Sequence, residues 1–113
     1  RRLLKILRSG KSLPTSYPYP VQVIQFGNDL SLIALGGETV VDYARRLQRE
    51  LAGKRIWIAG YSNEVFAYIP SERVLTEGGY EGGLAMKYFG IHGPFQPGLE
   101  TRIIGLVKKL LDQ

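Results

Sequence analysis

The chain of 113 residues contains no cysteine and only one histidine. Without cysteine it has no disulfides, no thiolate zinc sites and no cysteine nucleophile. This absence does not fix the compartment, because many exported proteins also lack disulfides. A catalytic zinc usually takes three protein ligands, so a single imidazole cannot complete an ordinary zinc site.

Several function-bearing motifs are also missing. The sequence has no Gly-x-Ser-x-Gly elbow, and its glycines match neither a phosphate loop nor a dinucleotide fingerprint, so neither a serine hydrolase nor nucleotide binding is indicated. No apolar run approaches the length of a membrane span, and the start lacks the features of a signal peptide. Because the chain starts at Arg1 rather than Met, we expect it to be a piece of a longer protein.

Acidic residues are absent from the first eleven positions, although the net charge of the whole chain is only +5. Such a basic run can dock on phosphates or anionic lipid. The alternative is a short amphipathic helix over residues 1–9, ended by Gly10, with a solvated basic face and a buried apolar stripe. The stripe would be Leu3, Leu4, Ile6 and Leu7. We expect no nucleic-acid partner, because no recognition helix or stacking motif accompanies the charge.

The apolar pattern divides the chain in two. Residues 1–20 are the basic helix and a Pro-rich connector that cannot be helical, and residues 21–113 form one α/β unit. In that unit, the pattern predicts a hairpin of strands 21–26 and 30–35 around Gly27-Asn28-Asp29. The second strand is nearly all apolar, which predicts that both of its faces are covered.

The hydrophobic period then becomes helical from Val40 to Leu51, with Gly53 as the stop, and a strand follows over 55–59. Strand, helix and strand at this spacing form a βαβ unit with parallel strands. The carboxyl ends of both strands share a sheet edge, so residues 36–38 and 60–63 are expected to form a crevice. The charged residues of this helix are expected to face outward: Arg45, Arg46, Arg49 and Glu50.

Shorter elements are predicted after this unit. Residues 65–69 resemble a strand, and residues 71–77 a brief helix capped by Ser71. Residues 78–98 are rich in glycine and are interpreted as a long loop. An amphipathic helix after Gly98 closes the chain. Its inward residues are expected to be Ile103, Leu106, Val107, Leu110 and Leu111.

Three residues have side chains suited to a metal site. Glu38 follows a strand end, where a carboxylate can hold a metal or act as a base, or it only complements the dipole of the first helical turn. Tyr80 has glycines on both sides that allow a close backbone approach, or it is a surface aromatic. His92 is the only imidazole, and a lone histidine is a weak indication of a ligand.

The order of these motifs resembles the neutral/alkaline (non-lysosomal) ceramidase family. Gly36-Gly37-Glu38 opening a helix with Arg45-Arg46-Leu47 is similar to that family's Pro-Gly-Glu and Arg-Arg-Leu, although the family's Pro is Gly36 here. Gly60-Tyr61-Ser62-Asn63 resembles a polar turn with Asn, and Tyr80-Glu81-Gly82 resembles a Tyr-Glu-Gly/Ala motif. The resemblance extends from about Val21 to Leu111 and also includes Tyr68, Ile69, Gly93 and Pro94.

The resemblance implies a zinc amidohydrolase that cleaves the N-acyl bond of ceramide or a related lipid amide. In that family two early histidines, a glutamate and a tyrosine hold the zinc, and the last two map onto Glu38 and Tyr80. The zinc would polarise the amide carbonyl and activate a water. Further residues of the substrate crevice would be Asn63, Tyr68, Glu81 and His92. His92 stands where the family usually has an aromatic residue.

The expected fold is therefore a small mixed α/β sheet with packed helices, an incomplete part of a larger catalytic domain that is inactive alone. Its partners would be the upstream part of the same domain with two histidine ligands, a lipid amide and a membrane surface. The resemblance also points to an extracytoplasmic or membrane-associated location. The alternative is a noncatalytic domain that docks on anionic membrane or a partner protein through its basic N-terminal segment.

Overall fold

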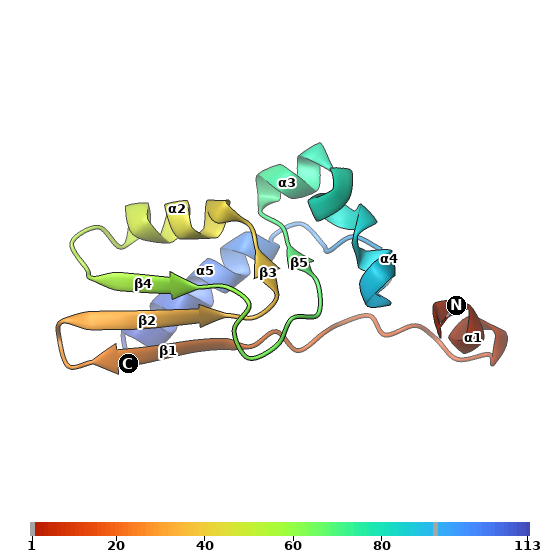
Figure 1. Cartoon of the computed structure of the whole chain (residues 1–113), viewed down its shortest axis with the longest axis horizontal. Helices are drawn as coiled ribbons and strands as arrows, with labels where there is room; N and C mark the ends of the chain where they lie inside the picture. The colour runs from red at the N-terminus through yellow and green to blue at the C-terminus, as the bar shows by residue number, and fades with distance from the viewer. Residues whose placement is uncertain (1, 92) are drawn as a thin grey trace.

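The computed structural model describes residues 2–91 and 93–113, which form a mixed α/β fold (Figure 1). Strands β1 (Val21–Phe26), β2 (Leu30–Leu35) and β4 (Ile56–Ala59) make a sheet in the order β1-β2-β4, and β3 (Glu38–Thr39) pairs with β5 (Tyr68–Ile69) in a second sheet. The helices are α1 (Arg2–Arg8), α2 (Val41–Glu50), α3 (Glu72–Glu77), the π-helical turn η1 (Tyr80–Leu84), α4 (Met86–Phe89) and α5 (Leu99–Leu111).

The hairpin and the βαβ unit are confirmed. β1 and β2 pair antiparallel, with Phe26 opposite Leu30 across the turn, where Gly27 has φ 57°. β2 and β4 pair in parallel, with Leu32 opposite Trp57. Strand pairing therefore follows the hydrophobic period, and both parallel strands point their carboxyl ends toward the same edge.

The core lies on one face of the three-stranded sheet. Ile33 and Leu35 of β2 are 0% exposed, and α5 passes behind the three strands in Figure 1. The helical residues in this core are Tyr43, Leu47 and Leu51 from α2 and Ile103, Ile104, Val107 and Leu111 from α5. The predicted inward position of Leu106 is wrong, because the buried stripe of α5 passes through Ile104 and leaves Leu106 exposed.

The other face of the same sheet has no helix over it in the part of the chain that the structure describes, and none lies in front of the strands in Figure 1. Ile24, Phe26 and Trp57 on this face are 39%, 54% and 64% exposed. The prediction that both faces of β2 are covered therefore holds only in part: no described helix covers this face, although Ala34 of β2 is only 7% exposed. An apolar strand is stabilised when other elements cover both of its faces. Whether such elements are present depends on the rest of the fold, not on the composition of the strand. We call this surface the bare face: Gln22, Ile24, Phe26, Leu30, Leu32, Ala34, Trp57 and Ala59.

Helix α1 lies at the far end of the connector, away from the sheet (Figure 1). None of its described residues is buried, and Leu4 and Leu7 are exposed, so the predicted buried stripe is wrong. The connector contacts the main body through Tyr17, whose ring stacks on Phe66 with centroids 3.9 Å apart. No helix among residues 2–91 and 93–113 is long and apolar enough to cross a membrane.

A buried polar network joins three helices. Glu100, only 8% exposed, accepts hydrogen bonds from Arg46 Nη1 at 3.1 Å and from the backbone N–H of Glu72 at 2.9 Å. Glu72 in turn accepts from the backbone N–H of Gly98 at 2.6 Å. The two glutamates thus cap each other's helix starts. Arg46 was predicted to face outward, but its long side chain reaches from α2 to α5, while its Nε bonds Glu50 at 2.7 Å.

Candidate functional site

Gly37 fixes the path of the chain after β2. It has φ 67°, and a Cβ at this position would lie 2.7 Å from Ile69 Cγ1 and 2.8 Å from the carbonyl oxygen of Ala67. Its carbonyl accepts a hydrogen bond from Tyr61 N–H at 2.8 Å, and its N–H donates to the Glu64 carbonyl at 2.6 Å. The segments after β2 and β4 therefore lie side by side, as the parallel register predicts.

Gly36 packs closely against the end of the connector. A Cβ on Gly36 would lie 2.6 Å from Cγ of Pro20, the last residue of the connector. The Gly36 N–H donates to the Pro20 carbonyl at 3.2 Å, and its own carbonyl accepts from the Tyr19 hydroxyl at 2.9 Å. A proline at this position would lose the first of these bonds and collide with Pro20.

Glu38 does not lie in the first turn of the helix, so the dipole interpretation of this residue is wrong. It belongs to β3, where it pairs with Tyr68 of β5, and α2 begins only at Val41. The acidic residue of the first helical turn is Asp42, which accepts from Arg73 Nε at 3.0 Å and from the Ser71 hydroxyl at 2.5 Å. The Glu38 carboxylate therefore lies at the edge of the sheet and not at the start of the helix.

Three tyrosines gather around Glu38. Hydrogen bonding with the Glu38 carboxylate raises the pKa of Tyr61 to about 12 and also raises the pKa of Tyr68. The Tyr68 ring meets the Tyr80 ring edge-on, with centroids 5.5 Å apart. Glu38 and Tyr80, far apart in sequence, are therefore both neighbours of Tyr68.

The glycines around Tyr80 serve the packing of the backbone. α3 is capped by Ser71, as predicted, and the chain leaves it through Gly78 and Gly79, whose φ angles are 73° and 78°. A Cβ on Gly82 would lie 2.7 Å from the Val74 carbonyl oxygen, so η1 packs directly on α3. The glycine-rich segment interpreted as a long loop thus contains two short helical turns, η1 and α4.

A pocket of about 280 Å³ opens beside Glu38. Its walls combine an apolar side with charged groups: Glu38, Thr39, Val40, Val41, Tyr68, Arg73, Val74 and Glu81. Three of the residues predicted from the sequence, Glu38, Tyr68 and Glu81, thus line one pocket, and Tyr80 lies next to it against Tyr68.

Two predicted crevice residues are not brought into this pocket. Asn63 lies outside the lining and places Nδ2 3.5 Å from Gln22 Oε1, at the rim of the bare face. His92 lies outside the described residues. Tyr61 lies in the predicted crevice segment 60–63 but was not singled out as a site residue, and Arg73 was missed. The position of Tyr61 directly after a strand-ending glycine was the available signal for the first, whereas nothing in the pattern distinguished Arg73 from a surface arginine.

The donors at this site fit part of a zinc centre. Carboxylate oxygen is an ordinary zinc ligand, and a phenol can join it when the cation lowers its pKa. Within the described ranges 2–91 and 93–113, no group of three or more His, Cys, Asp or Glu side chains could hold a metal ion. Glu38 and Tyr80 would therefore hold a zinc only together with ligands from other residues.

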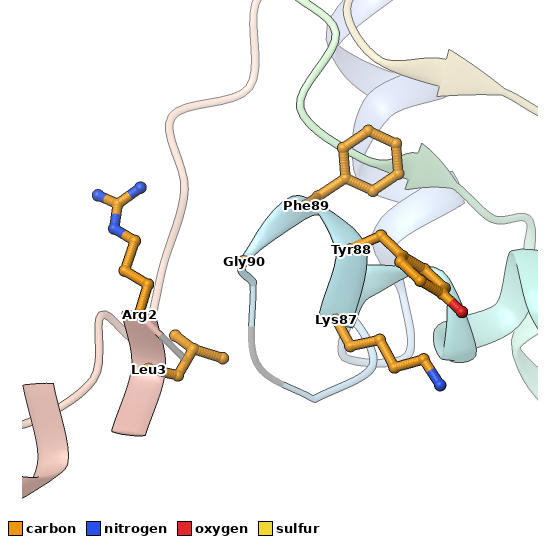
Figure 2. Close-up of a pocket in the computed structure, with 6 residues that line it drawn as sticks. All are labelled: Arg2, Leu3, Lys87, Tyr88, Phe89 and Gly90. Atoms are coloured by element: carbon orange, nitrogen blue, oxygen red, sulfur yellow. The ribbon is translucent and has the colours of Figure 1, made fainter. Parts of the chain in front are cut away.

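A second pocket, of about 360 Å³, lies between α1 and α4 (Figure 2). It is lined by Arg2, Leu3, Lys87, Tyr88, Phe89 and Gly90. The Lys87 ammonium lies 5.2 Å from the centre of the Tyr88 ring. Among the described residues this lining is basic and apolar and has no carboxylate or imidazole, so those residues offer no metal ligand comparable to Glu38.

Comparisons with protein-family models, with curated proteins and with solved structures give no match to this chain.

Proposed function

We propose that this chain is the C-terminal part of the catalytic domain of a ceramidase-like zinc amidohydrolase, to which it contributes Glu38 and Tyr80 as two of the zinc ligands. One observation carries the proposal: pairing of β3 with β5 and packing of η1 on α3 bring both residues beside the same side chain, Tyr68. Resemblance to the family singles out the same two residues.

The other residues of the site have roles that suit this chemistry. A zinc bound there would supply a Lewis acid for the amide carbonyl and an activated water. Tyr61 and Tyr68 lie close enough to the Glu38 carboxylate for it to raise their pKa values, and they would orient it as residues behind a metal ligand commonly do. Both phenols are protonated at neutral pH and can therefore act as hydrogen-bond donors.

The pocket wall also suits an aliphatic substrate. Val40, Val41 and Val74 give it an apolar side, while Arg73 is held by Asp42 at 3.0 Å and by Glu77 at 2.8 Å. Because these carboxylates neutralise the guanidinium, the pocket does not present a free cation to an anionic substrate. This favours an uncharged lipid amide over a phosphate ester.

The test compares two carboxylates of the complete protein that contains this segment. We expect Glu38→Ala to abolish stoichiometric zinc, measured by plasma mass spectrometry, and to abolish hydrolysis of a fluorescent ceramide. Asp29→Ala, which removes an exposed carboxylate from the hairpin turn, should preserve both. Stoichiometric zinc in the folded Glu38→Ala variant would contradict the proposal.

A second candidate function is docking on anionic membrane through the N-terminal segment. It is favoured by α1, which exposes Leu4 and Leu7 beside the cations Lys5 and Arg8 and buries none of its described residues. We expect salt-sensitive sedimentation of the chain with phosphatidylserine vesicles, lost in the double variant Lys5→Glu/Arg8→Glu and unaffected by Glu38→Ala. Equal sedimentation of the double variant would exclude this role for α1.

A further inference from the structure

We propose that Tyr17 and Tyr19 of the connector are positioning residues for Glu38. They fix the backbone on both sides of Gly37 and so hold the carboxylate where a zinc would bind. The inference rests on the proposed function, because that proposal makes Glu38 a metal ligand. Neither tyrosine is among the described residues that line the pocket beside Glu38, so both act through the backbone.

Tyr19 holds the chain just before Glu38. Its hydroxyl donates to the Gly36 carbonyl at 2.9 Å, and the Gly36 N–H donates to the carbonyl of Pro20 at 3.2 Å. The Tyr19 ring itself is partly buried against the hydrophobic core, which fixes the position of its hydroxyl. The connector therefore holds both backbone polar groups of the residue that lies two positions before Glu38.

Tyr17 holds the neighbouring segment, residues 64–67, which lies between β4 and β5. Its ring stacks on Phe66 with centroids 3.9 Å apart, and its hydroxyl donates to the Glu64 carboxylate. The Tyr19 ring meets Phe66 edge-on, with centroids 6.1 Å apart. In Figure 1 the connector accordingly runs beside the loop between β4 and β5. Both tyrosines therefore press on one side of this segment.

The same segment holds the backbone of the candidate zinc ligand. The Glu64 carbonyl accepts from the Gly37 N–H at 2.6 Å, and the Ala67 carbonyl accepts from the Glu38 N–H at 2.9 Å. A Cβ on Gly37 would lie 2.8 Å from the Ala67 carbonyl oxygen, so the two segments are in close contact. Because a zinc–carboxylate bond is only about 2.0–2.2 Å long, a small shift of this backbone displaces the ligand.

The contacts of the connector are concentrated at this place. Among the described residues, the hydrogen bonds that join residues 12–20 to the rest of the chain end on Gly36 and Glu64. Beyond the connector, α1 buries none of its described residues. The connector is thus fastened where the chain enters the candidate site, and this arrangement suits a positioning role.

The first experiment measures the zinc affinity of the complete protein by competition with a chromophoric chelator. Tyr19→Phe removes only the hydroxyl that bonds Gly36, and should weaken zinc binding about tenfold, as loss of a residue that orients a ligand commonly does. Tyr43→Phe is the matched control. It removes a buried hydroxyl that donates to the Pro70 carbonyl, also at 2.9 Å, and should leave the zinc affinity unchanged.

Two results of this comparison would overturn the inference. One is an unchanged zinc affinity in Tyr19→Phe. The other is an equal loss of affinity in Tyr43→Phe, because loss of stability alone would then explain the change.

A second experiment needs no zinc. Amide hydrogen exchange of this chain, followed by NMR, compares the Gly37 and Glu38 amides with that of Ser31, which donates to the Arg55 carbonyl at the other end of the sheet. Tyr17→Ala should speed exchange at Gly37 and Glu38 several-fold relative to Ser31. Equal acceleration at all three amides would contradict a local role for the connector.

The two proposals can fail separately. A complete protein without zinc, together with faster exchange at Gly37 in Tyr17→Ala, would sink only the enzyme assignment. Zinc bound as tightly by Tyr19→Phe as by the unaltered protein would sink only the positioning role.

Discussion

The two faces of the three-stranded sheet carry the same kind of side chain and meet different surroundings. On one face Ile33 and Leu35 are 0% exposed beneath α2 and α5, while on the other Ile24 and Trp57 remain open to solvent. Burial stabilises apolar surface by about 25 cal/mol per Å², so the covered face already contributes to folding and the bare face does not. The difference shows that an apolar composition alone does not determine whether a sheet face is covered. In this chain the described helices cover only one of the two faces.

The largest expected effect comes from removing the same atoms on each face. Ile33→Ala leaves a cavity under the helices and should lower the free energy of unfolding by about 2–5 kcal/mol. Ile24→Ala removes the same atoms from an open surface and should cost less than about 1 kcal/mol. Urea denaturation of the isolated chain measures both. Similar losses at the two positions would mean that the bare face is covered in this chain.

Substitutions at two glycines test how tightly the chain packs at the sheet edge beside the candidate site. Gly27 and Gly37 both have positive φ, but only at Gly37 would a Cβ meet atoms closer than 3 Å. Gly27→Ala should cost about 1–2 kcal/mol for the left-handed conformation, and Gly37→Ala about 2–5 kcal/mol, because overpacking adds to it. The measurement is again the free energy of unfolding in urea. Equal costs would show that the segment after β2 does not contact strand β5.

Arg46 joins the helices over the covered face. Removing its side chain should lower the free energy of unfolding by less than the core substitution does. Arg46→Ala removes a partner from the nearly buried Glu100 and should cost about 1–3 kcal/mol. Arg45→Ala, on the exposed side of the same helix, serves as the matched control and should change stability by less than about 0.5 kcal/mol. A control variant as costly as Arg46→Ala would refute a role for the network.

Acid should loosen the same helices through two carboxylates. The Lys108 ammonium and the Arg46 guanidinium lower the pKa of Glu50 to about 2, and Arg73 and Ser71 lower that of Asp42. A lowered carboxyl pKa stabilises the folded state above the unfolded value, near pH 4, and this gain is lost as the pH falls toward 2. We expect the urea midpoint to fall in that interval, and the fall to shrink in Glu50→Gln and Asp42→Asn. An unchanged pH profile in the double variant would contradict this origin.

The fold could be predicted where one local pattern decided it. The hairpin, the parallel β2–β4 pair and the Ser71 cap follow from hydrophobic period and capping chemistry. The exposure of Leu4 and Leu7 could not be predicted, because burial of a helix depends on whether the connector brings it to the body. The depth of Arg46 was missed for a similar reason, since its partner Glu100 lies on a helix far along the chain.

The candidate site was predictable in its parts but not in its construction. Parallel strands predicted that Tyr61 and Gly37 meet. The two-residue pairing of β3 with β5, which joins Glu38 to Tyr68, is too short to leave a period in the sequence. From the sequence, the glycines after α3 were explained by the backbone freedom that they give near Tyr80. In the structure Gly82 is needed because a Cβ there would collide with the Val74 carbonyl oxygen, and this contact cannot be recognised before the chain is folded.

The central claim is that this chain holds one half of a zinc site. Its most direct test is the amount of zinc bound at equilibrium dialysis, measured side by side on the isolated chain and on the complete protein. We predict about one zinc per complete protein and no stoichiometric zinc on the isolated chain, because four ligands are the rule for a tetrahedral site. Stoichiometric zinc on the isolated chain, or none on the complete protein, would contradict the account.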